Sequence, residues 1–558
     1  MNFNQELTFD QRLENLRNFV KRFSDNYERY KYGDYNEANV RVDFIDPFFE
    51  LLGWDVGNRQ GYSELYRDVV REDTVSIEGK AKAPDYSFRI GGARKFFVEA
   101  KRPSFDLKTA PEPAIQVRRY GYSAKLPFSI LTDFEEFAVY NTRIQPKKND
   151  TANIARVFYC NFREYEKNFE FIYNTFSREA ILKGYFDRFA EKKSKDRGVS
   201  EVDEEFLKLI EKWRGELAQN IALRNPDIDV YHLNIAVQRI IDRIIFIRIA
   251  EDRNMEEYGG LKQTLHNGAY SALDELFRKA DDKYNSGLFK PEKWISELII
   301  DDKVLAGIIN NFYPYECPYE LSVMPIETLG SIYERFLGKT IRFRNVKGGH
   351  TAIVEEKPEV RKAGGVYYTP EYIVDYIIDN TLGVKLDEFK TPAKITELRI
   401  LDPACGSGSF LVGAYNKLIA YHLDYYLNNN RDKALREGRI YQVDDKTYRL
   451  SINEKQSILL NNIYGVDIDI QAVEVTKLSL LLKLMEGEQT EGKEELFKHS
   501  DFKWLPDLSN NIRCGNSLIS SDFYSDKQMS LFGDEDLRRI NVFDWEKEFE
   551  RVFKAGGF

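Results

Sequence analysis

A glycine-rich segment between two apolar runs constrains the fold of this chain more than any other feature. Residues 398–401 have the pattern of a strand, DPACGSG follows at residues 402–408, and the next apolar residues have the pattern of a helix. A strand, a glycine turn and a helix in this order are typical of a cofactor-binding corner. Gly406 and Gly408 have no Cβ, so the backbone there can approach a ligand closely. The last third of the chain is therefore predicted to be a Rossmann-like α/β domain.

The charge of this turn indicates the kind of cofactor. A phosphate-binding turn carries three glycines in the pattern G-x-G-x-x-G, but here the third glycine is absent and Asp402 precedes the first. A carboxylate at the end of a strand repels a pyrophosphate and attracts a cation. The sulfonium and amino groups of S-adenosylmethionine fit that preference, so S-adenosylmethionine is the predicted cofactor.

Two further segments have the pattern of strands that end in polar residues. Residues 462–469 end near Asp467, which is predicted to accept both ribose hydroxyls, with Asp469 as the alternative. Residues 512–519 include Asn516, which is predicted to bind the adenine amino edge. Nearly sixty positions separate Gly408 from Asp467, whereas about 20 are usual in dinucleotide-binding folds. Residues 422–449 are therefore interpreted as an insertion that contains a hairpin.

A helix is predicted to begin at Glu371, upstream of the glycine turn. Thr369 has the residue type of an N-cap, and Pro370 is expected in the first turn of that helix. Taken alone, this segment is no more than a capped helix.

The first third of the chain combines helices with a strand pair. Residues 8–31 and 37–52 have helical patterns, and the second of these ends at Gly53. Residues 83–90 alternate like a half-buried strand, two glycines make a turn, and residues 94–101 form the returning strand. The pattern predicts a β-hairpin in a mixed α/β domain.

Charged residues of this hairpin make a candidate metal site. Glu99 and Lys101 point to the same face, because residues two apart in a strand share a face. Asp85 lies at the start of the paired strand, where it can meet them across the hairpin. Two carboxylates suit Mg²⁺, which prefers oxygen ligands and activates a bound water. Lys101 is predicted to orient or deprotonate that water.

The alternative interpretation of this pattern is chance, since an Asp followed by Glu-x-Lys occurs in many chains. Against it stand the strand–turn–strand context, Pro84 directly before Asp85, and the local charge. The whole chain has a net charge of −10, but residues 80–125 contain eleven Lys or Arg against four Asp or Glu. A local basic excess suits a phosphate backbone, although a solvated charged face would look the same.

The middle of the chain is predicted to be a helical connector. Residues 233–255 and 325–338 have apolar residues at helical spacing, and we assign both segments spacing and coupling rather than chemistry. His232 and His266 have no metal partner at a useful spacing. Residues 339–361 are basic and are interpreted as a flexible or DNA-contacting hinge. The predicted domains are residues 1–165, 166–360 and 361–558.

The motifs of the last third occur in the order GGVYYTP, DPACGSGSFL, GVDID and CGNSL over about 155 residues. This ordered set resembles the gamma-class DNA amino-methyltransferases, a highly specific match. The resemblance implies an S-adenosylmethionine-dependent methyltransferase fold, with the Tyr-Thr-Pro segment over the methionine part of the cofactor, and adenine N6 as the methylated position. The implied cofactor-binding residues are Tyr368, Thr369, Pro370, Asp402, Ala404, Cys405, Gly406, Gly408, Asp467, Ile468, Asn516 and Ser517.

Residues 35–141 carry a second resemblance. Pro-Asp followed by VEAK resembles the PD-(D/E)xK nuclease core, and the segment after it resembles type I restriction subunits and type IIG restriction–modification enzymes. The resemblance implies that Asp85 and Glu99 bind Mg²⁺, that Lys101 is the catalytic base or orients the water, and that Gln116 and Tyr120 are supports near the site. Glu37, on the preceding helix, is a further implied metal ligand.

The sequence contains no Asn-Pro-Pro-Tyr, the motif through which the methyltransferase family holds its target base. We therefore expect this chain to be the front part of a longer restriction–modification protein, in which a DNA nuclease is joined to a methyltransferase fold incomplete at its C-terminus. The alternatives are a non-catalytic, S-adenosylmethionine-binding regulatory subunit and a methylation-only enzyme with a vestigial nuclease.

The expected partners are double-stranded DNA and a second chain that supplies Asn-Pro-Pro-Tyr and the target-recognition domain. The four cysteines are scattered, without the spacing of a metal site or a disulfide framework. No apolar run approaches the roughly 20 residues of a membrane span. A cytoplasmic protein without a membrane partner is expected.

Overall fold

The computed structural model divides the chain into two compact units. Unit 1 consists of Met1–Val202, Tyr313–Met324 and Asp444–Thr447, and unit 2 of Asp203–Phe312, Pro325–Val443 and Tyr448–Phe558. The structure describes residues 7–62, 67–71, 83–194, 202–253, 255–266, 268–284, 287–313, 317–346, 349–357, 369–444, 447–486, 505–525 and 540–558.

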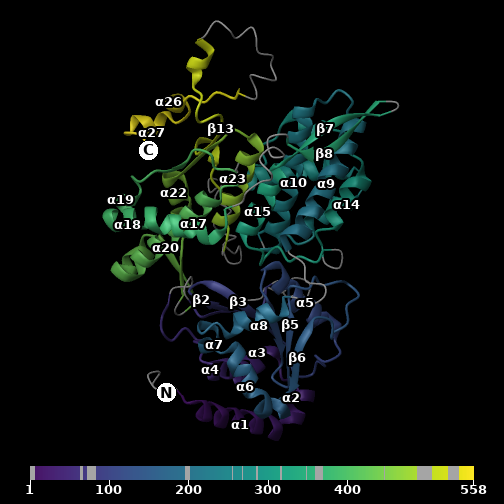
Figure 1. The fold of residues 1–558 in the computed structure, drawn as a ribbon, viewed down its shortest axis with the longest axis vertical. Helices are drawn as coiled ribbons and strands as arrows, with labels where there is room; N and C mark the ends of the chain where they lie inside the picture. Colours follow the sequence, from purple (N-terminus) through teal and green to yellow (C-terminus); the bar gives the residue numbers. More distant parts are fainter. Residues whose placement is uncertain are drawn as a thin grey trace. The chain divides into compact units, whose positions relative to one another are not determined.

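Unit 1 is built on a six-stranded mixed sheet in the order β1-β2-β3-β4-β5-β6 (Figure 1). Neighbouring strands are antiparallel except β3 and β4, which run parallel and are joined by helix α5 (Pro111–Ser123). The predicted hairpin is the pair β2–β3. The strands are β1 (Val69–Val70), β2 (Tyr86–Ile90), β3 (Ala93–Ala100), β4 (Phe128–Thr132), β5 (Glu136–Asn141) and β6 (Arg156–Asn161).

Aromatic side chains join the helices of unit 1 to its sheet. The ring of Phe23 contacts Phe44 and Phe134, which lie on a second helix and after β4. Asn26 separates α1 from α2, so the predicted helix over residues 8–31 is two helices. The elements of this core are α1 (Phe9–Asp25), α2 (Tyr27–Tyr32), α3 (Glu37–Val40), η1 (Arg41–Ile45), α4 (Asp46–Leu51), η3 (Phe162–Glu164), α6 (Tyr165–Phe176), α7 (Arg178–Leu182) and α8 (Tyr185–Lys193).

The first part of unit 2 is helical, as the apolar spacing predicts. Helix α10 is buried along most of its length, because other elements pack around it. The helices are α9 (Val202–Arg224), α10 (Val230–Asp252), α11 (Gly260–Gln263), α12 (Ala269–Tyr284), α13 (Lys293–Ser296), α14 (Asp302–Asn310) and α15 (Ile326–Leu337).

A β-hairpin occupies most of the segment interpreted as a flexible or DNA-contacting hinge, so the flexible interpretation is wrong, whereas contact with DNA stays a prediction. Strands β7 (Lys339–Val346) and β8 (Gly349–Glu356) pair antiparallel along their whole length. Ile341 and Ala352 are buried, and Asn234 of α10 exchanges hydrogen bonds with the backbone of Ile341. The flexible interpretation relied on the high Lys and Arg content of this segment. It overlooked the apolar residues that alternate with the basic ones and pack the hairpin against the helices.

The second part of unit 2 contains a parallel sheet in the order β13-β12-β9. Its strands are β9 (Ile400–Asp402), β12 (Ile463–Asp467) and β13 (Ile512–Cys514), and the hairpin predicted within the insertion is β10 (Ile440–Asp444) with β11 (Thr447–Leu450). The other elements are α17 (Glu371–Ile378), η4 (Asp379–Gly383), α18 (Val384–Phe389), α19 (Pro392–Ile395), α20 (Ser409–Asn429), α21 (Arg431–Arg436), α22 (Ile452–Asn462), α23 (Ile470–Leu484), η5 (Leu508–Asn510), η6 (Ser521–Ser525), α26 (Trp545–Glu548) and α27 (Glu550–Lys554).

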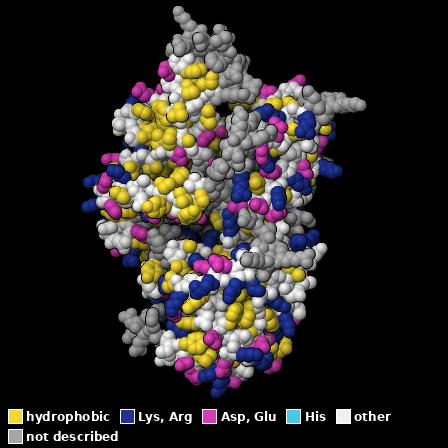
Figure 2. All heavy atoms as spheres, in the orientation of Figure 1, with side chains coloured by type: hydrophobic (Ala, Val, Ile, Leu, Met, Phe, Trp, Pro, Cys, Tyr) yellow, Lys and Arg dark blue, Asp and Glu magenta, His cyan; other side chains and the backbone are white. Residues whose placement is uncertain are grey.

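The surface of unit 2 exposes several large apolar side chains. Tyr372 and Tyr376 of α17 and Val384 of α18 are more than half exposed, and hydrophobic side chains gather over these helices on the face in Figure 2. Within the described ranges, no helix is long and apolar enough to cross a membrane.

Gly465 in β12 is predicted to tolerate no larger residue. A Cβ on Gly465 would lie 2.7 Å from Leu411 Cδ1 and 3.2 Å from Cys405 Sγ. We expect Gly465→Ala to lower the free energy of unfolding by about 1–3 kcal/mol, because overpacking forces neighbouring atoms apart. Gly215→Ala is the matched control: its Cβ meets nothing within 4 Å in α9, so it should stabilise the helix. Urea denaturation of both variants checks this, and equal stability of the two would contradict it.

The carboxyl group of Asp242 in α10 makes stability depend on pH. Asp242 is fully buried and accepts hydrogen bonds from Gln238 Nε2 and the Tyr333 hydroxyl. Burial raises its pKa to about 7, above the unfolded value of about 3.9. The folded state therefore holds a proton that the unfolded state has lost, and this contribution to stability is present below pH 4 and disappears as the pH rises through 7.

We expect Asp242→Asn, which resembles the protonated carboxyl group, to remove this dependence. Between pH 5 and 7 the wild type should lose about 1 kcal/mol of unfolding free energy per pH unit relative to the variant. Chemical denaturation at several pH values measures the difference, with the exposed Asp282→Asn as control. Parallel pH profiles of wild type and Asp242→Asn would show that this carboxyl group titrates elsewhere.

Candidate functional site

The hairpin of unit 1 brings together the predicted Asp85, Glu99 and Lys101. Lys101 Nζ lies 2.5 Å from Glu99 Oε1, as expected for side chains on one face of a strand. Asp85, directly before β2, reaches across the hairpin and accepts a hydrogen bond of 2.7 Å from the backbone N–H of Ala100. The three predicted residues therefore lie at one end of the hairpin.

The two carboxylates are buried at the same place. Asp85 and Glu99 are each 1% exposed. Burial, followed by the charge of Asp85, raises the pKa of Glu99 to about 8. Burial also raises the pKa of Asp85, opposed by the positive charges of Arg41 and Lys101. Two buried carboxylates held close together repel each other, and a bound cation would relieve that repulsion.

The donor set of this cluster fits a hard divalent cation such as Mg²⁺. Among the described residues, Glu99 Oε2 is buried and has no hydrogen-bond partner. That oxygen is therefore available to a cation, and carboxylate oxygens with water suffice for Mg²⁺. No group of three or more His, Cys, Asp or Glu side chains in the described part of the chain is arranged to hold a metal ion. Glu37, the further predicted ligand, is half-exposed, and its Oε2 lies 4.0 Å from Lys101 Nζ.

Arg41 also enters this site and was missed by the sequence analysis. Its Nη1 lies 3.1 Å from Asp85 Oδ1, and its guanidinium lies over the Tyr86 ring, 5.0 Å from the centroid. Arg41 begins the π-helical segment η1, four positions after Glu37. That helical spacing from a predicted site residue is the signal that could have found it.

Gln116 and Tyr120 lie on α5, between the parallel strands of unit 1. Gln116 Nε2 donates to the Tyr120 hydroxyl at 3.2 Å, and Tyr120 is buried. The pKa of Tyr120 lies well above its usual value, mainly because of burial and then the charge of Glu99. Tyr120 packs against Phe97 of β3, which lies on the same strand face as Glu99.

The glycine turn of unit 2 lies between β9 and α20. Asp402 Oδ1 accepts from the backbone N–H of Ala404 at 3.1 Å, and Asp467 Oδ2 accepts from Gly406 N–H at 2.9 Å. The predicted second acidic residue therefore contacts the predicted turn across 61 positions of sequence. Burial raises the pKa of both Asp402 and Asp467.

Both glycines of the turn adopt backbone conformations that favour glycine. The φ angle is +54° at Gly406 and +85° at Gly408. A Cβ on Gly408 would lie 2.8 Å from Thr476 Cγ2. Thr476 of α23 also donates to the Gly406 carbonyl at 2.8 Å and lies 3.8 Å from Cys405 Sγ. The turn is thus closed against α23, and only a residue without a side chain fits there.

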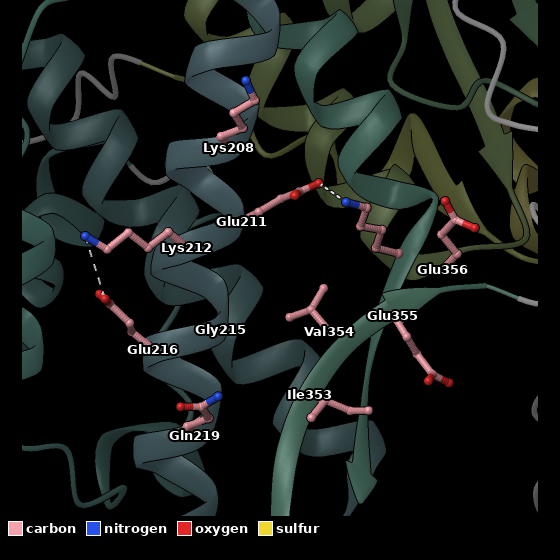
Figure 3. A pocket seen from close by; sticks show the side chains of 11 residues that line it. Lys208, Glu211, Lys212, Gly215, Glu216, Gln219, Ile353, Val354, Glu355 and Glu356 are labelled. Atoms are coloured by element: carbon pink, nitrogen blue, oxygen red, sulfur yellow. Dashed lines mark ion pairs between the residues drawn. The ribbon is translucent and has the colours of Figure 1, made fainter.

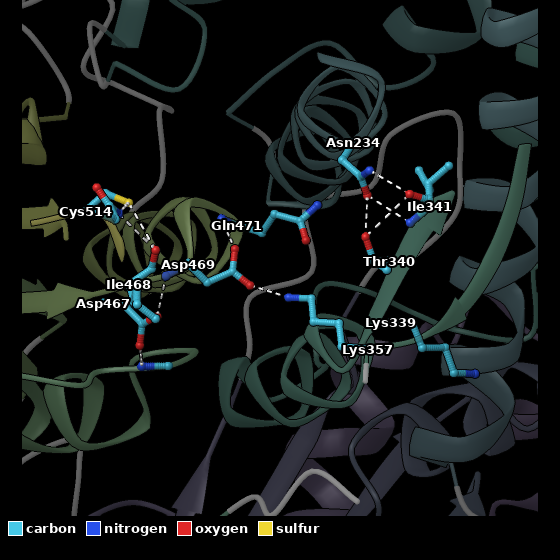
Figure 4. Close-up of polar contacts among 12 residues, drawn as sticks. Asn234, Lys339, Thr340, Ile341, Lys357, Asp467, Ile468, Asp469, Gln471 and Cys514 are labelled. Carbon is cyan, nitrogen blue, oxygen red and sulfur yellow. Dashed lines mark hydrogen bonds and ion pairs between the residues drawn. The ribbon is translucent and has the colours of Figure 1, made fainter. Parts of the chain in front are cut away.

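The end of β12 presents Ile468 and Asp469 beside Asp467 (Figure 4). Ile468 is half exposed, as suits a residue predicted to contact a cofactor. Asp469 forms an ion pair with Lys357 and caps α23 by accepting from Gln471 N–H. Asp467 has no such cation partner in the part of the chain that the structure describes, which favours Asp467 over Asp469 for the ribose.

The remaining predicted cofactor residues lie after β13 and before α17. Asn516 Oδ1 accepts from Leu518 N–H at 3.0 Å, and the carbonyl of Ser517 accepts from Trp545 Nε1. Tyr368 lies outside the described residues. The predicted Thr369 cap is wrong: Pro370 occupies the N-cap position of α17, with extended ψ and no side-chain hydrogen bond. Helix α17 begins at Glu371, as predicted, so the N-cap position falls on Pro370, whose ring has no side-chain acceptor for a capping hydrogen bond.

An open groove of about 700 Å³ lies between α9 and the β7–β8 hairpin (Figure 3). Its opposite charges pair with one another, as Lys339 with Glu211 at 2.5 Å and Lys212 with Glu216 at 3.9 Å. This balance of charge gives the groove no preference for an anion or a cation, and we assign it no ligand.

Known proteins resemble this chain over nearly its whole length. The chain is 36% identical over 537 residues to the Type II restriction enzyme and methyltransferase RM.Eco57I of Escherichia coli, an alignment that covers 95% of this chain and 51% of that protein. It is a relative of the fused type II restriction–modification enzymes. The chain spans about half the length of this curated relative.

One further match has a defined position within unit 2. The family model described as the DNA-methyltransferase domain of MmeI matches residues 379–528. The adenine-specific methyltransferase PglX of Streptomyces coelicolor is 29% identical over 176 residues, 32% of this chain and 12% of that protein. The MjaIX methylase subunit of Methanocaldococcus jannaschii, a type I restriction enzyme, is 31% identical over 189 residues, 34% of this chain and 23% of that protein.

Proposed function

We propose that this chain is part of a restriction–modification protein that cleaves DNA with Mg²⁺ in unit 1 and binds S-adenosylmethionine for adenine-N6 methylation in unit 2. The convergence of Asp85, Glu99 and Lys101 carries the nuclease half of this proposal. The Asp467–Gly406 contact and the two left-handed glycines support the cofactor half.

The nuclease proposal gives each residue a role in a PD-(D/E)xK-type site. Asp85 and Glu99 hold the divalent cation, which lowers the pKa of a bound water and neutralises charge at the scissile phosphate. Lys101 Nζ, held at Glu99, orients the attacking water or takes its proton. Gln116 and Tyr120 support the Glu99 side of the site, and Glu37 reaches it from the helix before the core.

In the proposed cofactor site, backbone groups of the glycine turn and acidic side chains surround the methyl donor. Gly406 and Gly408 admit the donor close to the turn, and Asp467 accepts the ribose hydroxyls. The adenine edge is assigned to Asn516, and the methionine end to the Thr369–Pro370 segment. We propose a Rossmann-like arrangement of these elements, within domains at residues 1–165, 166–360 and 361–558.

Double-stranded DNA is the proposed partner of both sites. A segment or second chain carrying Asn-Pro-Pro-Tyr and a target-recognition domain is the further partner that methylation calls for. A regulatory subunit that binds S-adenosylmethionine without methylating, and a methylating protein with a vestigial nuclease, remain the competing functions. The divalent-cation fit of Glu99 favours the first proposal over a vestigial nuclease.

Two measurements on the wild-type chain separate these functions. Calorimetric titration with S-adenosylmethionine tests the cofactor half, and plasmid nicking with Mg²⁺ against EDTA tests the nuclease half. Binding with nicking supports the fused function, binding without nicking supports a vestigial nuclease or a regulatory subunit, and absence of both excludes all three.

A further inference from the structure

The carboxylate of Glu334 reaches the glycine turn from helix α15, a segment predicted to serve spacing and coupling rather than chemistry. Glu334 Oε2 accepts from the Ser407 backbone N–H at 3.2 Å and from the Ser407 hydroxyl at 2.5 Å. Both Glu334 carboxylate oxygens lie 3.2 Å from the position of a Cβ on Gly406. Because Ser407 is 1% exposed, water cannot replace these hydrogen bonds at low cost.

The contact completes the hydrogen bonding of the turn. Asp467 accepts from Gly406 N–H, and Thr476 donates to the Gly406 carbonyl. Glu334 accepts the hydrogen bond of the next backbone N–H, that of Ser407. Its helix, α15, precedes the parallel sheet in the chain. Helix α15 is itself fixed by the hydrogen bond from Tyr333, the preceding residue, to Asp242 of α10. The position of the turn therefore depends on the helical part of unit 2.

Glu334 also adds to an unbalanced negative charge at the turn. Asp402, Asp467 and Glu334 each accept a hydrogen bond from a backbone N–H of residues 404–407. In the described ranges, none of these carboxylates forms an ion pair with Lys or Arg. The turn thus carries three negative charges. A cationic ligand there is attracted by these charges, whereas a neutral ligand is not.

We propose that Glu334 is a positioning and selectivity residue of the S-adenosylmethionine site. Its carboxylate holds the Ser407 turn in place, and its charge favours the sulfonium of the methyl donor over the neutral sulfide of the product, S-adenosylhomocysteine. The inference rests on the proposed binding of S-adenosylmethionine.

Two substitutions separate the holding role from the charge. Glu334→Gln keeps one oxygen that can accept from Ser407 but removes the charge. We expect it to weaken S-adenosylmethionine binding about 3- to 10-fold and S-adenosylhomocysteine binding less than 2-fold. Glu334→Ala removes both functions, and we expect it to weaken binding of the donor by 10-fold or more. A residue that acted only through structure would weaken both ligands by the same factor.

The experiment is calorimetric titration of wild type, Glu334→Gln, Glu334→Ala and Arg335→Ala with each ligand, with thermal melts of all four. Arg335 is the exposed neighbour on α15, and its variant should bind both ligands as the wild type does. A larger loss for the donor than for the product in Glu334→Gln supports the proposal, even if Glu334→Ala does not fold. Equal losses for the two ligands, or none, would overturn it. A wild type that binds neither ligand would instead reject the proposed cofactor function.

Discussion

Replacing Lys101 by alanine is expected to reduce Mg²⁺-dependent DNA cleavage by about 100- to 10,000-fold, the usual contribution of a positioned general acid or base. Lys101 directly follows β3 and is largely buried, and its Nζ is held 2.5 Å from Glu99 Oε1, so its ammonium group has a fixed place beside the proposed metal ligand. The measurement is the single-turnover rate of plasmid nicking at saturating Mg²⁺.

The control for this prediction is Lys95→Ala, six positions earlier along β3. It removes the same charge from the strand that leads to Lys101, roughly 20 Å from the site at about 3.3 Å per residue, and should leave the rate within a few-fold of wild type. Binding of S-adenosylmethionine should be unaffected by either change. Equal nicking rates in Lys101→Ala and wild type would refute the role of Lys101, and equal losses in both variants would point to DNA affinity instead.

Asp467→Ala is expected to weaken S-adenosylmethionine binding by more than about 100-fold, because hydrogen bonds to a charged group contribute about 1.5–3 kcal/mol each. Asp467 is proposed to accept two ribose hydroxyls while it accepts backbone N–H groups from Gly406 and Asp469. Calorimetric titration measures the loss.

Asp467→Asn sharpens this test. Each carboxylate oxygen of Asp467 accepts a backbone N–H, so an amide NH₂ on either side would face another donor. We therefore expect the asparagine variant to bind nearly as poorly as the alanine variant. Asp469→Asn is the comparison: if it alone abolished binding while Asp467→Ala did not, Asp469 would be the ribose ligand.

The sequence predicted those parts of the two candidate sites that depend on local geometry. Glu99 and Lys101 share a face because successive strand residues alternate, and the structure joins their side chains. The glycine turn between β9 and α20 follows from the residue types at Gly406 and Gly408, whose φ angles are positive. A prediction that rested on composition alone was less successful. The basic residues 339–361 suggested a flexible segment, but most of them belong to the β7–β8 hairpin.

Only the tertiary structure decided which distant residues complete each site. Arg41 meets Asp85 across 44 positions, and Glu334 meets Ser407 across 73. No local pattern contains such contacts, since they arise when buried helices pack against a sheet or a turn. The sequence by itself determined a strand hairpin with three charged groups and a glycine corner with acidic flanks. Folding determined that an arginine enters the first site and that a carboxylate from a connecting helix holds the second, because burial leaves polar groups there that need partners.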